Sequence, residues 1–494
     1  MNYLDCSIEE MHQAIKEGKV TPEDLVKEAL QRAKESQPEL NAFVTITEQA
    51  ALDAVKNLEP SDSPLYGIPC AIKDNFSTKG ILTTASSNIL KDYIPSFDAT
   101  AVKKLKEAGS ISIGKTVLDE LAMGGTGTTG HTGAVKNPWD HHRLIGGSSA
   151  GSSAAVAAGI VPFALGSDTG DSIRKPAGFG GIVGYKPTYG RISRFGLFPF
   201  ACSLDHVGCF TRYVKDVAYV MDALKGQDPK DMTSLKTEDI KYSEQLGGAV
   251  SGKKLFYIKE IMDPENYKEN MDEELKGVFQ NFETVKKHCE DLGMTVEAVS
   301  IDKNLLKAIF SAYITISCAE ATSNNSNLTG IIFGPRGEGN SIDEIMFDAR
   351  TKGFSELIKR RFILGSYVLQ KENQEKLFLN AGRVRHMLVD QMNEFFKEYD
   401  GLILPVSGGP APLAKSDDID KLSDRYLLME NHMAIGNFGG YPSITIPSGT
   451  INGLPIAINI TGPQFKDCDV LNIAYALESR LGQSGKIPEK EEQA

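Results

Sequence analysis

Serine hydroxyls and glycines gather in one stretch of the chain, residues 146–177, which reads GGSSAGSSAAVAAGIVPFALGSDTGDSIRKPA. Ser148 and Ser149 lie in its first glycine-rich loop, and Ser172 lies in its second. Glycine lets the backbone turn sharply, so that several N–H groups can point at one spot. A hydroxyl beside clustered backbone donors is what acyl transfer needs, namely a nucleophile and a hole for the oxyanion. A pair of Ser/Gly linkers has the same composition, and the stretch alone does not decide between the two interpretations.

A serine nucleophile also needs a base, and the candidate is Lys73. The apolar residues 67–72 (GIPCAI) predict a buried strand that ends at this lysine. Burial lowers the pKa of a lysine toward neutrality, and a neutral lysine can activate a serine directly or through a second hydroxyl. An ordinary lysine at the end of a strand is the alternative, and Lys73 by itself does not exclude it.

The segment Gly109–Thr116 (GSISIGKT) matches the letters of a nucleotide-binding P-loop. A P-loop follows a strand and leads into a helix. Here a helix is predicted before the motif, and Ser-Ile-Ser-Ile alternates as a strand does. We therefore reject an ATPase interpretation.

The pentapeptide GSSAG around Ser149 matches the nucleophile elbow of α/β-hydrolases. That elbow requires a buried strand immediately before it, whereas the preceding residues, NPWDHHRL, do not predict such a strand. The last histidine, His432, has no clear acid ahead of it to complete a triad. We reject this match as well.

The 494-residue chain has the composition of an ordinary globular protein, 41% hydrophobic, with a net charge of −12. A chain that binds nucleic acid by itself is usually basic, so we assign any RNA contact to a partner. The seven cysteines are scattered without a C-x-x-C pair, which disfavours a structural metal site and suits a reducing compartment. The N-terminus lacks a signal-peptide pattern, and no apolar run approaches the roughly 18 residues of a membrane span. We expect a cytoplasmic protein that contacts no membrane.

Helical and strand patterns alternate along the chain and indicate an α/β protein, most simply one large domain. A capping box at Ser7–Glu10 and an N-cap followed by proline at Thr21–Pro22 predict helices near the N-terminus. Further strands are predicted over residues 110–113, 161–165, 253–258, 294–301 and 401–405, and a hairpin over 443–460 with its turn at Asn452-Gly453. Further helices are predicted over residues 99–108, 154–160, 272–289, 304–324, 354–399 and 467–481.

Six sequence blocks between residues 70 and 200 resemble, in unbroken order, those of the amidase signature family. They are IKDN (72–75), GKT..DELAMG (114–124), NPWD (137–140), GGSSAGSSAAVAAG (146–159), GSDTGDSIRKPA (166–177) and GYKPTYGRISRFGL (184–197). Two later blocks, KRRFILGSYVL (359–369) and GNFGGYPSITIPSG (436–449), are similar to those of the family members that serve tRNA-dependent amidotransferases. The resemblance implies one amidase-signature domain over residues 1–485, with a central mixed sheet covered on both faces by helices. Within it we expect N-terminal helices in 1–60, a signature core in 65–215 and a flexible tail in 486–494.

The resemblance also implies a Lys–Ser–Ser catalytic set, which here is Lys73, Ser148 and Ser172. In the family the second serine attacks the amide carbon, and the first, which follows a cis peptide bond, relays the proton to the lysine. The implied oxyanion hole consists of the backbone N–H groups of Thr169, Gly170, Asp171 and Ser172. The family usually has glycine at the position of Asp171, and a carboxylate there would repel an oxyanion unless it is paired or points away.

Glutamine as the amide donor would need partners for its α-carboxylate and its α-ammonium group. The resemblance implies an arginine of the KRR block for the carboxylate, Arg361 in preference to Arg360. For the ammonium it implies Glu430, where the family has aspartate, and it adds Tyr313 as a third binding residue.

The implied function is that of a glutaminase component that supplies ammonia to convert Glu-tRNA(Gln) to Gln-tRNA(Gln), with Asp-tRNA(Asn) as a second candidate acceptor. The resemblance implies a heterotrimer in which a B subunit binds the tRNA and uses ATP and Mg²⁺, while a small C subunit wraps the interface. This chain would itself need no cofactor and no metal. Two alternatives stay open, a stand-alone amidase for another small amide and a catalytically weak scaffold whose oxyanion hole is blocked by Asp171.

Overall fold

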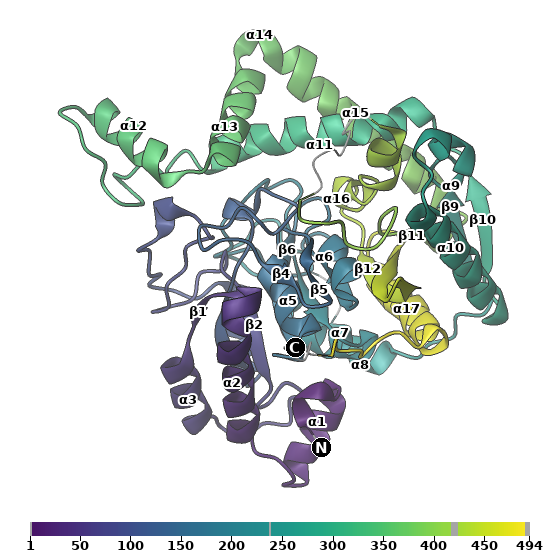
Figure 1. Ribbon diagram of the computed structural model, residues 1–494, viewed down its shortest axis with the longest axis horizontal. Helices are drawn as coiled ribbons and strands as arrows, with labels where there is room; N and C mark the ends of the chain where they lie inside the picture. Colours follow the sequence, from purple (N-terminus) through teal and green to yellow (C-terminus); the bar gives the residue numbers. More distant parts are fainter. Residues whose placement is uncertain (1, 237–238, 416–422, 490–494) are drawn as a thin grey trace.

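The computed structural model describes residues 2–236, 239–415 and 423–489. Within them, eleven strands form one mixed sheet at the centre of the molecule (Figure 1). Two further strands, β4 (Lys136–Asn137) and β5 (Asp140–Leu144), form a separate pair. In spatial order, the large sheet consists of β1 (Phe43–Ile46), β3 (Ile111–Thr116), β2 (Pro69–Lys73), β6 (Phe163–Asp168), β8 (His206–Thr211), β7 (Val183–Lys186), β12 (Ser443–Ile451), β13 (Leu454–Thr461), β11 (Gly401–Pro405), β9 (Lys254–Ile258) and β10 (Thr295–Val299).

Helices flank this sheet (Figure 1). They are α1 (Ile8–Lys16), α2 (Pro22–Leu40), α3 (Glu48–Lys56), α4 (Thr100–Glu107), α5 (Ala150–Ala157), α6 (Arg174–Gly180), α7 (Val214–Leu224), α8 (Tyr242–Gln245), α9 (Lys259–Met262), α10 (Glu273–Asp291), α11 (Lys303–Asn324), α12 (Ile342–Gly353), α13 (Glu356–Leu369), α14 (Lys371–Gln374), α15 (Asn380–Phe395), α16 (Ala434–Phe438) and α17 (Asp467–Leu481). Short helical turns cover Tyr3–Asp5, Asn88–Leu90, Glu120–Ala122, Pro264–Asn270, Glu375–Leu379 and Arg425–Met429.

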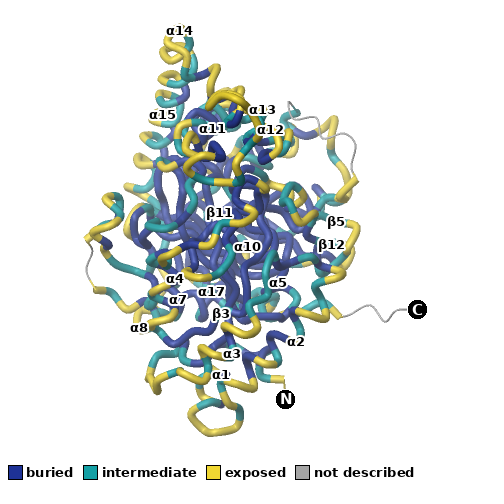
Figure 2. Tube along the Cα trace, turned by 90° about the vertical axis from the view of Figure 1, so that its left-hand side faces the viewer, coloured by how far each residue is buried: buried dark blue, intermediate teal, exposed yellow. Residues whose placement is uncertain are grey.

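The middle strands of the sheet are the most buried part of the fold, drawn dark blue in Figure 2. β2 lies between β3 and β6 and is parallel to both, and all five of its residues are buried. Strands buried on both faces have apolar runs without alternation, which is why GIPCAI was recognisable as a strand. Lys73 is its last residue and is fully buried.

The local signals read from the sequence are confirmed in several places. The capping box of Ser7 and Glu10 is formed at the start of α1, and Thr21 caps α2. Within the segment GSISIGKT, residues Ile111–Thr116 form strand β3 and not a phosphate-binding loop. The hairpin of β12 and β13 turns at Asn452 and Gly453, both with positive φ. The strand β1, which we did not predict, pairs with β3 at the edge of the sheet.

The helix α5 is buried along its entire length, and all eight of its residues are small. At its first turn the backbone of Gly151 comes so close to Ala42 that an added Cβ would lie 2.2 Å from the Ala42 carbonyl oxygen. The Gly151 N–H donates to the Val117 carbonyl, and the Val117 N–H donates to the Ala42 carbonyl, both at 2.9 Å. The start of α5 is therefore fixed to the N-terminal segment through the residue that follows β3.

Helices α11 to α15 extend away from the sheet at the top of Figure 1 and include many exposed residues in Figure 2. Large apolar side chains are exposed on this part, namely Ile331, Ile332, Ile342, Phe347, Ile363, Tyr367, Leu379 and Met387. Of the described helices, α11 is the one whose length and composition would suffice to cross a membrane. It packs against α13 and α15, as a core helix of a folded domain does.

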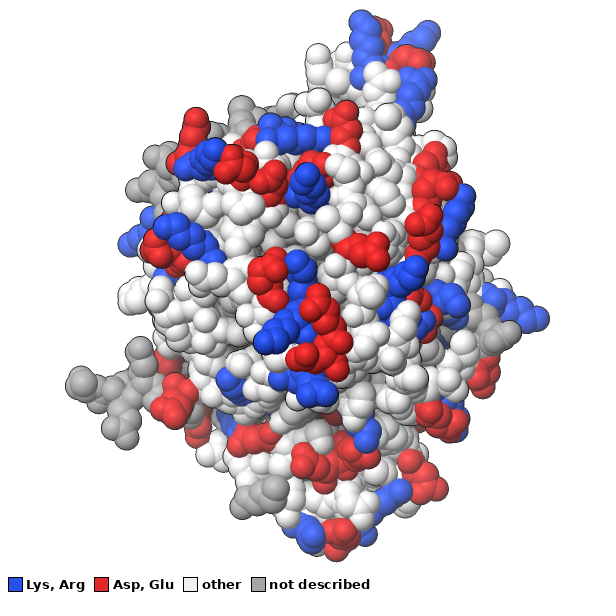
Figure 3. Space-filling model, turned by 90° about the vertical axis from the view of Figure 1, so that its right-hand side faces the viewer, with Lys and Arg blue, Asp and Glu red and all other residues white. Residues whose placement is uncertain are grey.

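Charged residues of both signs are interspersed on the face shown in Figure 3, where no single-sign patch dominates. The expected domain boundary at residue 485 stays a prediction. Of the expected tail, residues 490–494 lie outside the described residues, whereas Ile487 lies against Gly159.

Candidate active site

Lys73 lies at the end of β2 and points its amino group at three serine hydroxyls. Its Nζ is 2.9 Å from Ser148 Oγ, 2.8 Å from Ser149 Oγ and 2.9 Å from Ser167 Oγ. It is also 3.3 Å from the Ser167 carbonyl oxygen. The first two serines come from the loop before α5 and the third from β6, so three elements of the signature core meet at this amine.

The serine hydroxyls around Lys73 have different hydrogen-bond partners. Ser149 Oγ donates to the Ser167 carbonyl oxygen at 3.1 Å, and Ser167 Oγ accepts from Asn75 Nδ2 at 3.0 Å. A neutral lysine has two N–H donors and one lone pair. Ser149 Oγ and Ser167 Oγ can take the two donors, which leaves Ser148 Oγ to direct its proton at the lone pair. The arrangement suits proton exchange between Ser148 and Lys73.

The pKa of Lys73 is lowered from 10.5 to about 7, because complete burial disfavours the ammonium form. The carboxylates of Asp119, Asp168 and Asp205 act in the opposite direction but do not cancel this effect. A group with a pKa near neutrality can both accept and return a proton at the pH of a cell.

Ser148 follows a cis peptide bond from Gly147, as the family resemblance implied. The Ser148 carbonyl accepts from the Asp119 N–H at 3.1 Å. The Asp119 carboxylate in turn receives five hydrogen bonds, from the backbone N–H groups of residues 126–129 and from Thr129 Oγ1. This carboxylate holds the loop that covers Gly147 and so fixes the first serine.

Ser172 lies on the second loop, between β6 and α6, and is 3% exposed. Its carbonyl oxygen accepts from the Ser149 N–H at 3.3 Å, which ties the two loops together. In the part of the chain that the structure describes, the backbone N–H groups of Gly170, Asp171 and Ser172 donate no hydrogen bond. They are therefore available to a developing oxyanion beside the Ser172 hydroxyl.

A buried ion pair between Arg174 and Asp168 holds the second loop in place. Arg174 binds Asp168 through Nε at 3.1 Å and Nη2 at 3.0 Å, and Nη2 also donates to the Gly170 carbonyl at 2.7 Å. Burial acts to raise the pKa of Asp168, but the charges of Arg174 and Lys186 outweigh it and hold this pKa below its usual range. The loop around Gly170 is thus anchored to a charged pair whose two side chains are completely buried.

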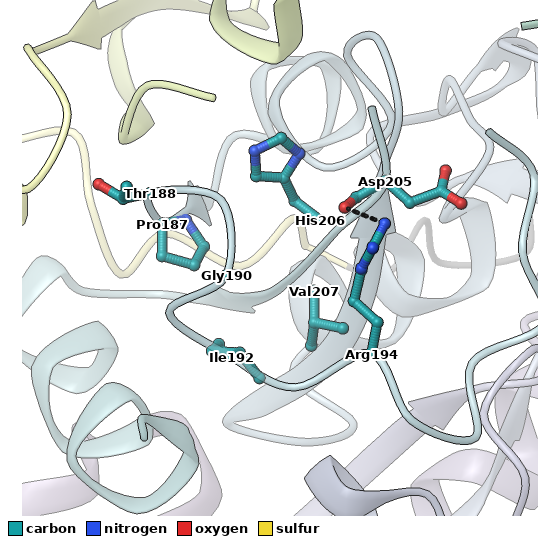
Figure 4. Close-up of a pocket in the computed structure, with 8 residues that line it drawn as sticks. All are labelled: Pro187, Thr188, Gly190, Ile192, Arg194, Asp205, His206 and Val207. Carbon is teal, nitrogen blue, oxygen red and sulfur yellow. Dashed lines mark hydrogen bonds between the residues drawn. The ribbon is translucent and has the colours of Figure 1, made fainter. Parts of the chain in front are cut away.

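Asp205 supports the same loop from the side. Its carboxylate accepts from Thr169 Oγ1 at 2.7 Å, while burial raises its pKa to about 6. Figure 4 shows the small pocket next to it, where Arg194 reaches the main chain of Asp205 at 3.4 Å and the carboxylate points away. The predicted oxyanion residue Thr169 is therefore fixed through its own side chain.

The carboxylate of Asp171 is paired. Lys175, one helical turn later, places its Nζ 3.2 Å from Asp171 Oδ2. The same Nζ donates to the Glu430 carbonyl at 2.6 Å and lies 3.6 Å from Glu430 Oε2. Glu430 thus lies beside the second loop, which carries Ser172. It contacts Lys175, a residue that we did not single out in the sequence.

Tyr313 and Arg361 reach the same region from α11 and α13. The Tyr313 ring lies against Gly170, where an added Cβ would be 2.8 Å from its Cζ. Burial raises the pKa of Tyr313, and the nearby Arg361 charge opposes this rise. Nη1 of Arg361 is buried without a hydrogen-bond partner among the described residues, whereas Arg360 is exposed. An unpaired buried guanidinium nitrogen is ready to receive an anionic group.

Sequence reasoning missed the residues that support this site. They are Asn75, Asp119, Ser167, Asp168, Arg174, Lys175 and Asp205. The pair of Asp168 and Arg174 had a weak signal, since two opposite charges lie on either side of Gly170 in the segment GSDTGDSIR. Among the described residues, no group of three His, Cys, Asp or Glu side chains is arranged to hold a metal ion.

The sequence and fold match those of amidases and of amidotransferase subunits. The family model described as Amidase matches residues 24–471. The chain belongs to the amidase family. The amidase is 40% identical, over 99% of both chains, to the glutamyl-tRNA(Gln) amidotransferase A subunit of Streptococcus pneumoniae.

Solved structures extend the comparison. The amidase fold described above matches the crystal structure of the glutamyl-tRNA(Gln) amidotransferase A subunit of Thermotoga maritima, with a TM-score of 0.80 and 35% identity over 99% of this chain and 98% of that one. It also shares its fold with the peptide amidase of Stenotrophomonas maltophilia, with a TM-score of 0.84 and 24% identity over 99% and 100% of the two chains.

Proposed function

We propose that this amidase is the glutamine-hydrolysing subunit of a tRNA-dependent amidotransferase and supplies the ammonia that converts Glu-tRNA(Gln) to Gln-tRNA(Gln). The two amidotransferase relatives, similar over nearly their full length, support this activity. The observation on which the chemistry depends is the buried Lys73, with a pKa of about 7, 2.9 Å from Ser148 Oγ. It provides a base without any histidine.

In the proposed reaction the Ser172 oxygen attacks the side-chain amide carbon of glutamine. Its proton passes to Ser148, whose own proton moves to the neutral Lys73. The free N–H groups of Gly170 and Asp171 stabilise the oxyanion of the tetrahedral intermediate. The C–N bond then breaks, and the proton returns from Lys73 through Ser148 to the leaving nitrogen, so that ammonia leaves and an ester to Ser172 remains.

Water completes the cycle through the same groups. Lys73 and Ser148 take a proton from the water molecule, which attacks the ester carbon, and the Ser172 oxygen leaves with that proton. The products are glutamate and the free enzyme. No additional residue is required, because one base serves both halves of the reaction.

The donor's α-carboxylate would bind Arg361, whose buried Nη1 has no partner among the described residues. Its α-ammonium group would bind Glu430, with Tyr313 closing the site over Gly170. We infer that the chain acts in a heterotrimer in the cytoplasm, where a B subunit binds the misacylated tRNA and uses ATP and Mg²⁺, and a C subunit wraps the interface. The mixture of charges on the face in Figure 3 agrees with an RNA contact made by a partner.

One observation favours a second candidate, a stand-alone amidase for a different small amide. Lys175 already contacts Glu430, the group that would hold the ammonium of glutamine. The scaffold alternative assumed that the Asp171 carboxylate blocks the oxyanion hole. Because this carboxylate is paired with Lys175, the alternative has no observation in its favour.

The test is to isolate the tagged chain from its own organism, identify the proteins that accompany it, and measure ammonia release from glutamine by the recovered complex. The proposal expects a tRNA-binding partner, a small third protein and glutamine hydrolysis that is lost in Ser172→Ala. Recovery of the chain alone, active on another amide and inactive on glutamine, would refute it in favour of the stand-alone amidase.

A further inference from the structure

A lysine occupies the side of the candidate site where the donor's amine is expected. Asp171 and Lys175 are one helical turn apart, and the Lys175 N–H donates to the Asp171 carbonyl at 2.9 Å. Side chains one helical turn apart lie on the same face, so the Lys175 side chain lies beside Asp171 in the second loop, which carries Ser172. Glu430 reaches the same ammonium from the segment before α16, far away in the sequence.

Lys175 remains positively charged in this setting. Burial acts to lower its pKa, but the carboxylates of Asp171 and Glu430 outweigh burial and raise it. The side chain of Lys175 is 12% exposed, and those of Asp171 and Glu430 are 28% and 24% exposed. Ion pairs that are partly shielded from water interact more strongly than pairs on an open surface.

The two oxygens of the Glu430 carboxylate have different neighbours. Its Oε1 accepts from the Gly408 N–H at 2.8 Å, which fixes the carboxylate, and its Oε2 faces Lys175. An ammonium group from a donor would therefore meet a carboxylate that a resident ammonium already compensates. Two cations around one carboxylate repel each other.

We propose that Lys175 competes with the α-ammonium group of the amide donor for Glu430, and that it thereby weakens the selection for donors that have this group. The inference depends on the proposed glutamine hydrolysis, because it assigns the specificity of that same site. Lys175 acts through Glu430 and is a specificity-determining residue, not a catalytic one.

The experiment compares two amides in the intact complex, glutamine and its des-amino analogue glutaramate, by ammonia release. Both have the carboxamide and the carboxylate, and they differ in the α-ammonium group. The main variant is the double substitution Asp171→Gly with Lys175→Gln, which removes both charges of the pair and leaves the backbone N–H in place. The matched control is Lys175→Arg, which keeps the positive charge between the two carboxylates.

In the double variant, kcat/KM for glutamine relative to glutaramate should rise about three- to tenfold, chiefly through a lower KM for glutamine, as expected for the loss of one competing partly shielded ion pair. Lys175→Arg should keep the wild-type ratio. Lys175→Gln alone should raise the ratio in the same way while lowering kcat for both amides, because Asp171 is then unpaired beside the oxyanion hole.

The inference would be overturned if the ratio of kcat/KM for glutamine to that for glutaramate stayed the same or fell in both the double variant and Lys175→Gln, with glutamine still hydrolysed. The proposed function would then remain intact. A complex that hydrolyses neither amide in its wild-type form would overturn the proposed function itself, and the inference with it. The ratio compares two substrates on one enzyme preparation, so partial unfolding of a variant does not change it.

Discussion

Replacing Lys73 by methionine should stabilise the protein at low pH more than at high pH, relative to the wild type. Lys73 is completely buried, and its pKa falls from 10.5 to about 7 on folding. Between these two values the unfolded chain holds a proton that the folded chain has released. The wild-type free energy of unfolding therefore decreases as the pH falls through this window, and the full loss is present below about pH 7.

The magnitude follows from the same two values. A change of one pH unit within the window is worth about 1.4 kcal/mol, so the whole window corresponds to about 5 kcal/mol for the fall from 10.5 to about 7. Between about pH 9 and about pH 6, the wild type should lose about 2 to 3 kcal/mol that a methionine variant does not lose. The hydrogen bonds from Lys73 to Ser148, Ser149 and Ser167 are removed at both pH values, so their cost cancels in this difference.

The assay is urea unfolding of wild type and Lys73→Met at both pH values. The single tryptophan, Trp139, reports on unfolding, because its indole donates to the Gly180 carbonyl at 2.8 Å beside the serine loops. Lys79→Met, an exposed lysine in the same segment, is the matched control and should change stability equally at both pH values. An equal effect of Lys73→Met at the two pH values would mean that folding does not neutralise this lysine, and the argument for it as a base would fail.

In the intact complex, kcat/KM for glutamine should rise about tenfold for each pH unit up to about pH 7 and then level off, because the lysine base must first lose its proton; a flat profile between about pH 6 and about pH 8 would contradict this. Ser172→Ala should lower ammonia release about 10³-fold or more, whereas Ser149→Ala should retain most activity, since its proton is bound to a carbonyl. The reverse order would restore the nucleophile-elbow interpretation. Arg361→Ala should raise KM about tenfold or more through loss of a charged hydrogen bond, and the exposed Arg360→Ala should not; equal effects would show that the donor carboxylate binds elsewhere.

The sequence predicted the local elements of the site better than its long-range contacts. Lys73 at the end of β2 and the hairpin at Asn452 and Gly453 follow from short patterns, because burial on both faces and a positive φ restrict residue types locally. The strand β1 was missed because four residues give too little alternation to recognise.

The contact of Lys175 with Glu430 had no such signal, since the two residues are 255 positions apart and each resembles an ordinary solvated charge. The family resemblance supplied Glu430 as a residue to examine. It could not supply the lysine, because only the folded chain brings Lys175 to that carboxylate.

The chain of contacts from Ala42 through Val117 to Gly151 has a consequence for how this protein can be cut. An N–H in the first turn of α5 depends on the carbonyl that follows β3, and that residue depends in turn on the N-terminal segment. A shortened protein that begins after residue 60 would retain Lys73, Ser148 and Ser172 but lack the backbone against which the serine loop rests. We therefore expect the N-terminal segment to be required for the position of the serine loop, so that it cannot be removed as an independent module. During synthesis, the N-terminal segment leaves the ribosome before Lys73, Ser148 and Ser172, whose positions depend on it.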